Sequence, residues 1–425
     1  MNADLIRQKL RAGALASYGS LYADIDAQTK RWLCAIDAFE ELYGKGRDLF
    51  LFSVPGRSEL SGNHTDHNHG AVLAGAIDRD IIAVAAVSDT PVIRLKSEGF
   101  PEDVVRLDDV SAPDRFRPYT SSALIAGTCR AVGDRGGTVG GFDAYTTTEV
   151  LKGSGISSSA AFEVMVGNIL NHLFCGGRFS GQELAMMAQY AENVYFGKPC
   201  GLMDQMACAV GGFVRIDFAD PQKPDVRPID FSLTNAGYSL CIVNTGGNHA
   251  DLNEDYASVP AEMKQVAKAL GQEVLRGLTE EDIRAALPAL REKTGDRAIL
   301  RALHFVREND RVLRQAAALE AGDIAGFLAG VAASGDSSFK YLQNVYTTKN
   351  TAEQGLSLAL CLTEGLLSGK GCAWRVHGGG FAGTIQAYVK AEYEEAYAKE
   401  MDRVFGVGAT MRLHIRPEGA TEIRL

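Results

Sequence analysis

Residues 151–163, LKGSGISSSAAFE, constrain the fold more than any other segment of this 425-residue chain. Gly153 and Gly155 come before three serines, and the serines open an apolar run with helical spacing that reaches residue 174. Serine hydroxyls can cap the free amide groups of a first helical turn. We therefore predict a glycine-rich loop that leads into a buried helix over residues 156–174.

This loop has two interpretations. Small residues let backbone amides approach a phosphate closely, and the following helix N-terminus adds a favourable potential. A glycine-serine turn before a helix is also common as simple capping. The segment is neither a G-x-x-x-x-G-K-[ST] loop nor a protein-kinase glycine loop, so by itself it favours phosphate binding without identifying a family.

A polar segment, PGRSELSGNHTDHNHG (residues 55–70), follows an apolar, strand-like run at 48–54. Pro55-Gly56 predicts a sharp change of direction, which would place the polar residues on a loop. Their density of hydrogen-bonding groups suits a polyhydroxylated ligand. The alternatives are a solvated loop and a histidine metal site, but the order of the histidines and the missing distant ligands argue against the metal site.

Two further segments carry candidate chemistry. In AENVYFGKPCGLMDQ (191–205), Glu192 and Asp204 lie across the end of a helix predicted at 181–196. A carboxylate beside phosphates holds magnesium or acts as a base, whereas each of these could also be a surface acid or a cap. RVHGGGFAG (375–383) lies between two strand-like segments and is either a flexible turn or a backbone-lined site wall.

The length suggests two domains. The proline-rich and charged segment PQKPDVRP (221–228) is typical of a linker or an exposed turn, and we place the domain boundary there, with domains at 1–225 and 226–425. Helical and strand patterns alternate in the second part, which predicts an α+β or split βαβ-like domain. The expected strands along the chain are 81–87, 91–95, 212–218, 237–243, 373–377, 383–389 and 409–415. The expected helices of the second part are 261–270, 278–292, 353–367 and 391–405.

Composition excludes several classes of partner. The formal charge is −10, from 53 acidic and 43 basic residues, without a long basic run, so we expect neither nucleic acid nor an anionic membrane as a partner. The eight cysteines contain no C-x-x-C pair, which favours reduced thiols. No stretch approaches 18 consecutive apolar residues, and the N-terminus is amphipathic. We expect a cytoplasmic protein, either a monomer or a weak homo-oligomer.

Taken together, these segments resemble the GHMP small-molecule kinase superfamily and, within it, the galactokinase family. PGRSELSGNHTDHNHG is similar to G-R-x-N-L-I-G-E-H-T-D-Y-N-x-G, and LKGSGISSSAA is similar to P-x-G-x-G-L-S-S-S-A-A. RVHGGGFAG resembles T-G-G-G-F-G-G, and AENVYFGKPCGLMDQ resembles A-E-x-x-x-x-G-x-P-C-G-I-M-D-Q. A weaker match at NTGGNHADLNEDY (244–256) places Tyr256. The resemblance covers residues 50 to 390.

The resemblance implies a GHMP kinase fold, with an N-terminal domain like ribosomal protein S5 domain 2, a C-terminal ferredoxin-like domain and the active site between them. It implies phosphorylation of D-galactose by ATP at the C1 hydroxyl, with Asp204 as base and Arg57 as its charge partner. The other implied site residues are Asn63, His64, Asp66, Gly201 and Tyr256 at the sugar, Gly153, Gly155, Ser157, Ser158 and Ser159 at the phosphates, and Ser159 and Glu192 at Mg²⁺.

The chain departs from these patterns mainly in the sugar segment. Glu59 stands in place of Asn, Asn63 in place of Glu and His67 in place of Tyr, while the third motif has His377 for Thr and Ala382 for Gly. One changed hydrogen-bonding group can redirect specificity. L-arabinose, galacturonate and N-acetylgalactosamine therefore remain alternative substrates, and a sugar- and ATP-binding sensor without turnover remains an alternative function.

Overall fold

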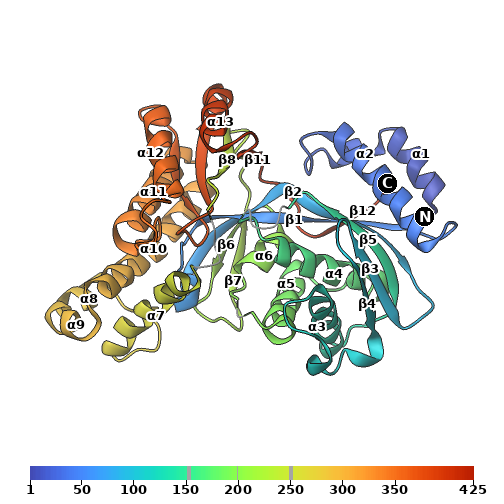
Figure 1. Cartoon of the computed structure of the whole chain (residues 1–425), viewed down its shortest axis with the longest axis horizontal. Coiled ribbons are helices and arrows are strands. Elements are labelled where there is room, and N and C mark those ends of the chain that lie inside the picture. The colour runs from blue at the N-terminus through green and yellow to red at the C-terminus, as the bar shows by residue number, and fades with distance from the viewer. Residues whose placement is uncertain (151–154, 199, 248–251) are drawn as a thin grey trace.

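The computed structural model describes residues 1–150, 155–198, 200–247 and 252–425. Two sheets organise the chain (Figure 1). The first sheet has the order β12-β1-β2-β5-β3-β4, and β6 pairs with β2 and β7. Its strands are β1 (Phe50–Ser61), β2 (Ala71–Val87), β3 (Val92–Ser97), β4 (Glu102–Arg106), β5 (Phe142–Thr148), β6 (Phe213–Asp217), β7 (Asp225–Ile229) and β12 (Thr421–Ile423).

Helices cover both faces of the first sheet (Figure 1). Alternate residues of β2 belong to different cores: Ala83 and Ala85 pack with α3 (Ser121–Asp134), α4 (Ser158–Phe174), α5 (Gly181–Tyr190) and α6 (Met203–Val210). Ile82 and Val84 pack with α1 (Ala3–Arg11) and α2 (Ile25–Tyr43). A strand buried on both faces is apolar without alternation, which explains the uninterrupted run at 81–87.

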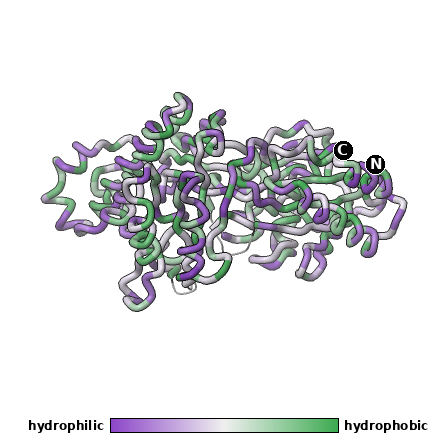
Figure 2. The backbone as a smooth tube through the Cα atoms, turned by 90° about the horizontal axis from the view of Figure 1, so that it is seen from above, coloured by the Kyte–Doolittle hydropathy of each residue, from purple (hydrophilic) through white to green (hydrophobic). Residues whose placement is uncertain are grey.

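The second sheet is antiparallel with the order β11-β8-β10-β9. Its strands are β8 (Tyr238–Asn244), β9 (Ala373–His377), β10 (Thr384–Lys390) and β11 (Thr410–Leu413). One face packs on α12 (Gly355–Leu367) and α13 (Ala391–Phe405). The remaining helices are α7 (Asn253–Ala269), α8 (Glu280–Ala285), α9 (Leu287–Thr294), α10 (Asp296–Glu320) and α11 (Ile324–Ser337). Purple and green alternate along most helices, as expected for helices that bury one face (Figure 2).

Several predicted elements are confirmed, including the buried helix α4 and the strands of the second sheet. The helix predicted at 278–292 is instead two helices, α8 and α9, divided at Ala286, and the predicted change of direction at 55–56 was wrong. The chain does not turn at Pro55-Gly56, because a β-bulge between Pro55 and Arg57 absorbs this pair and β1 continues to Ser61. Arg57 and Glu59 therefore lie on a strand. The segment predicted as a linker or an exposed turn begins with an exposed turn at 221–223 and continues into β7, which pairs with β6.

Short helical turns complete the fold near the motifs. They are the 3-10 turns η1 (Ala14–Tyr18), η2 (Asp66–Asn68), η3 (Leu107–Asp109) and η4 (Pro113–Arg115), and the π-helical turns η5 (Ala191–Phe196) and η6 (Ser338–Leu342). The helix predicted at 181–196 is thus α5 followed by η5. None of the helices in the described residues has the length and apolar character needed to span a bilayer. The division at 225/226 stays a prediction.

Candidate active site

The bulge in β1 brings Arg57 to the start of α4. Arg57 donates its backbone N–H to the carbonyl of Ile156 at 3.2 Å. Gly56 is required by this close approach, because a Cβ at this position would lie 2.7 Å from the same carbonyl oxygen. The strand and the loop before α4 therefore touch backbone to backbone.

Arg57 forms a two-point ion pair with Asp204 at the start of α6. Nε and Nη2 of Arg57 lie 2.7 and 2.9 Å from the two carboxylate oxygens. The remaining nitrogen, Nη1, donates to the carbonyl of Gly155 at 2.6 Å, and the Ser157 hydroxyl donates to Asp204. Burial alone would raise the pKa of Asp204, but Arg57 and Ser157 outweigh it, so this pKa lies below its usual range.

The phosphate-loop residues that the structure describes adopt a left-handed turn. Gly155 has φ +74°, and a Cβ there would lie 3.2 Å from Thr384 Oγ1. Ser157 has φ +61° and precedes α4, but its hydroxyl makes no capping bond. The capping prediction was therefore wrong for Ser157, because this hydroxyl turns to Asp204. Ser158 and Ser159 begin the helix, and Gly153 lies outside the described residues.

The two candidate metal ligands lie side by side. Ser159 Oγ is 3.4 Å from Glu192 Oε1, and Lys198 Nζ is 3.1 Å from the same oxygen. Gln205 Nε2 holds the other Glu192 oxygen at 2.7 Å. Oxygen ligands suit Mg²⁺, which commonly takes only one or two protein groups and completes its shell with phosphate and water. The ammonium group of Lys198 indicates that this carboxylate can hold a cation.

Asp66 and Gly201 meet at a small cavity. A Cβ on Gly201 would lie 2.5 Å from Asp66 Oδ2, so the absence of a side chain at position 201 leaves room for this carboxylate. The cavity has a volume of about 250 Å³, and His67, His69, Gln189 and Cys200 are among its other lining residues. Its size, and a lining that combines these polar groups with Leu202, Phe218 and Pro221, suit one small ligand with both polar and apolar faces.

His64 and Tyr256 both bind the glycine-rich third motif. His64 Nε2 lies 3.0 Å from the carbonyl oxygen of Gly379, and Tyr256 OH donates to Gly380 O at 2.7 Å. Burial lowers the pKa of His64 to about 4, so the ring is neutral at pH 7. Because Nε2 must donate to the carbonyl, Nδ1 is an acceptor that a hydroxyl group can approach.

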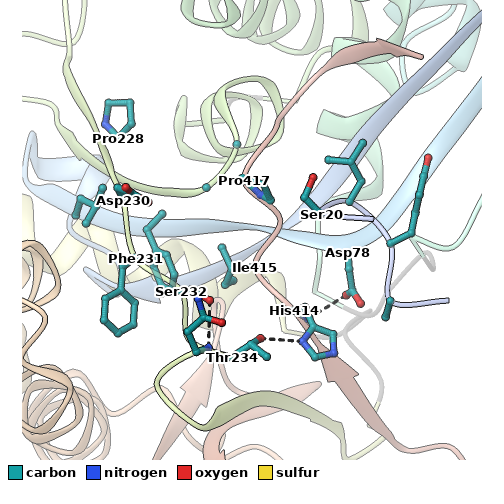
Figure 3. A pocket seen from close by; sticks show the side chains of 18 of the residues that line it. Ser20, Asp78, Pro228, Asp230, Phe231, Ser232, Thr234, His414, Ile415 and Pro417 are labelled. Atoms are coloured by element: carbon teal, nitrogen blue, oxygen red, sulfur yellow. Dashed lines mark hydrogen bonds between the residues drawn. The ribbon is translucent and has the colours of Figure 1, made fainter. Parts of the chain in front are cut away.

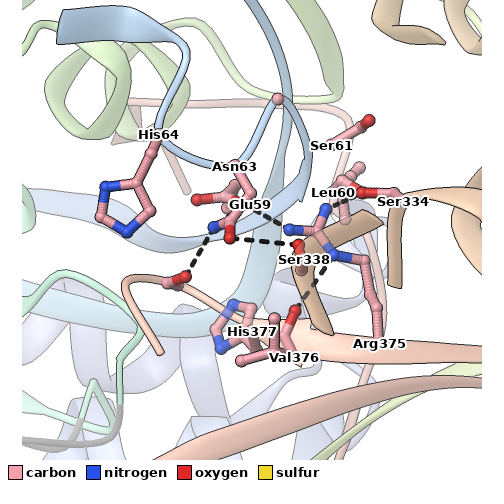
Figure 4. A network of polar contacts seen from close by, with 12 residues as sticks. Glu59, Leu60, Ser61, Asn63, His64, Ser334, Ser338, Arg375, Val376 and His377 are labelled. Atoms are coloured by element: carbon pink, nitrogen blue, oxygen red, sulfur yellow. Dashed lines mark hydrogen bonds and ion pairs between the residues drawn. The ribbon is translucent and has the colours of Figure 1, made fainter. Parts of the chain in front are cut away.

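Asn63 does not face a cavity. Its side chain is fully buried beside Glu59 and Ser338 (Figure 4). It bonds to Glu59, to the carbonyl of Gly378 and to Asn344. The amide has no surface left for a ligand in this arrangement. Direct contact between Asn63 and a sugar stays a prediction that this geometry does not favour.

A larger cavity lies away from these residues. It has a volume of about 850 Å³, and Figure 3 shows Asp78, Thr234 and His414 around it. Its lining contains aspartates but no lysine or arginine. This cavity offers no lysine or arginine to a nucleotide phosphate. The region lined by the sequence motifs is therefore the better candidate for the ATP-binding site.

The structure also reveals supporting residues that the sequence patterns did not suggest. On α10, His304 Nε2 lies 3.0 Å from Asn63 O, and Glu308 accepts from the Gly62 amide at 3.1 Å. Arg375 pairs with Glu59 at 2.7 Å. The only sequence signal for Arg375 was its place at the start of the segment RVHGGGFAG, two residues before the third motif itself. Among the described residues, no group of three or more His, Cys, Asp or Glu side chains is arranged to hold a metal.

Comparisons with known proteins agree with this geometry. A family model described as "Galactokinase galactose-binding signature" matches residues 37–87, and "GHMP kinases N terminal domain" matches residues 121–212. A galactokinase of Streptomyces coelicolor is 32% identical over 370 residues, which cover 87% of this chain and 92% of the relative. The chain belongs to the galactokinase family. A galactokinase of Chloroflexus aggregans is 30% identical and covers 90% of this chain and 95% of its own length.

Solved structures extend the family relationship to the fold. The Lactococcus lactis galactokinase complexed with galactose superposes with a TM-score of 0.76, at 26% identity, and the match covers 91% of this chain and 98% of that one. A mevalonate kinase superposes with a TM-score of 0.60 at 15% identity, covering 87% of this chain and 99% of its own. This chain therefore has the α+β GHMP kinase fold, and it is a sugar kinase of the galactokinase family.

Proposed function

We propose that the chain transfers the γ-phosphoryl group of ATP to the C1 hydroxyl of D-galactose, giving galactose 1-phosphate and ADP. The observation that carries this proposal is the Arg57–Asp204 pair. Its carboxylate lies between the loop that holds Gly155 and Ser157 and the segment that holds Gly201. An acceptor hydroxyl at Asp204 would therefore lie between the phosphate loop and the sugar cavity.

In the proposed reaction, the oxygen of the C1 hydroxyl attacks the γ-phosphorus, the bond from phosphorus to the β–γ bridging oxygen breaks, and the proton of the C1 hydroxyl passes to Asp204. A carboxylate with a lowered pKa is a weak base. We infer that the proton moves late, once the new P–O bond has made the hydroxyl more acidic. Arg57 keeps Asp204 ionised, and positioning supplies most of the rate enhancement, as in other phosphoryl transfers.

We assign Mg²⁺ to Ser159 and Glu192. When bound, the ion would neutralise charge on the β- and γ-phosphate oxygens. Gln205 fixes one Glu192 oxygen at 2.7 Å and leaves the other for a cation. Lys198, at 3.1 Å from that other oxygen, would move toward the phosphates.

For the sugar, we assign hydrogen bonds to His64, Asp66 and the backbone near Gly201, with Tyr256 packing beside the third motif. The relatives named above support galactose as the sugar. The expectations of a cytoplasmic location and of a monomer or weak homo-oligomer rest on composition alone and stay predictions.

The test compares the wild type with Asp204→Asn in Mg²⁺-dependent phosphorylation of galactose, and identifies the product by NMR. We expect galactose 1-phosphate from the wild type and a loss of turnover of about 10²–10⁴-fold in the variant. Asp89→Asn, at an exposed aspartate far from the motifs, is the matched control and should keep normal turnover. Ordinary turnover by Asp204→Asn would refute the base assignment, and binding of galactose without turnover by the wild type would refute the kinase reaction.

A further inference from the structure

Three of the departures from the galactokinase signature lie in one buried region. Glu59, Asn63 and His377 are 5%, 0% and 2% exposed, and they join the sugar segment to the third motif (Figure 4). The signature has an amide where this chain has Glu59 and an acid where it has Asn63. The chain thus carries the same two functional groups in exchanged positions.

The exchanged groups bond to each other and to one shared cation. Glu59 Oε1 accepts from Asn63 Nδ2 at 3.0 Å and from Arg375 Nη2 at 2.7 Å. Arg375 is fully buried, and its other two nitrogens donate to the carbonyls of Leu60 and Val376 at 3.0 Å each. A buried guanidinium needs both a charge partner and full hydrogen bonding, and Glu59 supplies the charge.

Asn63 connects Glu59 to the glycine-rich third motif through hydrogen bonds. Its Nδ2 also donates to Gly378 O at 2.7 Å, and its Oδ1 accepts from Asn344 Nδ2 at 2.7 Å. Asn344 Nδ2 in turn lies 3.0 Å from Gly379 O. The carbonyls of Gly379 and Gly380 are the groups that hold His64 and Tyr256. The network therefore ends at two proposed sugar contacts.

We propose that the exchange has made Glu59 and Asn63 positioning residues. Together with Arg375 and Asn344, they clamp the glycine-rich turn 378–380 against the sugar segment and so orient His64. Position 63 makes no contact with the sugar in this chain, and sugar choice lies with His64 and Asp66. This inference rests on the proposed sugar phosphorylation for its kinetic assay only. The contribution of the clamp to stability is measured separately, by thermal unfolding.

The first experiment compares Asn63→Ala with Asn344→Ala. Both remove one side of the clamp, but Asn344 is not part of the sugar segment 55–70 and, among the described residues, reaches it only through Asn63. We measure kcat and KM for galactose, 2-deoxygalactose, L-arabinose and galacturonate. Each variant should lower kcat/KM by about 10-fold or more, and by the same factor for every sugar that the wild type phosphorylates. Asn235→Ala, at an exposed asparagine, is the control and should match the wild type.

The second experiment is a double-mutant cycle with Glu59→Asn, Asn63→Glu and the exchanged pair. Glu59→Asn removes the charge partner of Arg375, and Asn63→Glu places a second carboxylate beside Glu59, so each single variant should lower both kcat/KM and Tm. The pair restores one acid and one amide, so its loss should be smaller than the product of the single losses, since neighbouring groups in one network are not additive. If Glu59→Asn or Asn63→Glu fails to fold, the comparison of Asn63→Ala with Asn344→Ala still tests the inference.

Two results would overturn the inference. One is a change in relative kcat/KM among the sugars for Asn63→Ala but not for Asn344→Ala, which would mean that Asn63 contacts the sugar. The other is single losses that multiply to the loss of the pair within about twofold. If the wild type phosphorylates no sugar at all, the proposed function fails instead, and the cycle is read from Tm alone.

Discussion

Glu163 lies behind the proposed metal ligands and forms no ion pair with any described residue. Its side chain is fully buried, and Oε1 has no hydrogen-bond partner in the described part of the chain. Gln205 Nε2 bridges the two acids, at 3.2 Å from Glu163 and 2.7 Å from Glu192. Burial, followed by repulsion from Glu192, raises the pKa of Glu163 well above its usual range. Glu163 is therefore protonated over a wide pH range in the folded protein.

This raised pKa predicts that Glu163 makes the protein less stable as pH rises. Above a pH of about 4.3 the unfolded chain releases the Glu163 proton while the folded chain keeps it, so stability falls by up to about 1.4 kcal/mol per pH unit. The fall ends at the folded-state pKa. Glu163→Gln should remove this slope and be more stable than the wild type near neutral pH. Urea unfolding of both proteins between pH 4.5 and 7 measures the difference.

The matched control for this measurement is Glu281→Gln, at an exposed glutamate on α8. Its stability should follow the wild-type curve across the pH range. Parallel curves for the wild type and Glu163→Gln would mean that Glu163 titrates normally.

Strand β1 and helix α10 show which features of the fold could be predicted from the sequence and which could not. The motifs identified the candidate site residues, but Pro55-Gly56 looked like the end of a strand, and only pairing with β2 shows that a bulge carries the strand onward. On α10, the buried face includes the polar residues Arg301, His304, Glu308, Arg311 and Gln315. The apolar residues of α10 recur at helical spacing, but apolar periodicity does not show that these polar side chains are buried or what they bond to.

The bulge leads to a prediction about Gly56. In Gly56→Ala the new methyl group would lie 2.7 Å from Ile156 O and 3.0 Å from Val150 Cγ1. We expect a loss of about 1–3 kcal/mol in the free energy of unfolding and a clear drop in kcat, because Arg57 moves with the strand. Gly133→Ala on α3, where a Cβ meets nothing within 4 Å, is the matched control and should be stabilising by about 0.5–1 kcal/mol.

Denaturant unfolding and galactose turnover of both glycine variants decide this point. Equal stability of Gly56→Ala and the wild type would mean that the bulge can relax around a side chain. Lost turnover without lost stability would instead indicate that the methyl group only displaces Arg57.

Residues 421–425 lie against the first sheet, far in sequence from the strand with which residues 421–423 pair. Ile423 pairs with Leu51 through β12, and Leu425 packs against the cluster formed by α1 and α2. Arg416 is 1% exposed, donates to Ser53 Oγ at 2.9 Å and lies 3.5 Å from the buried Asp80. The N-terminal half therefore depends on residues from the far end of the sequence.

We predict that residues 1–225 do not fold when expressed alone. The fragment lacks β12, the edge partner of β1, and it lacks Arg416, so the buried Asp80 keeps only Arg31 of the two arginines that pair with it in the described residues. Circular dichroism and thermal unfolding should show no cooperative transition for the fragment, and co-expression with residues 226–425 should restore one. A cooperative transition of the isolated fragment would confirm the division at 225/226 as an independent folding boundary.

The returning strand has a consequence for biosynthesis. β1 ends at residue 61 and its edge partner β12 ends at residue 423, so the ribosome must add nearly the whole remaining chain before the two can pair. At about 5–20 residues per second this takes tens of seconds. During that time the strand that carries Arg57 has an open edge, which is the kind of surface on which nascent chains associate and which chaperones protect. Residues 421–423 can close that edge only after they have left the ribosome.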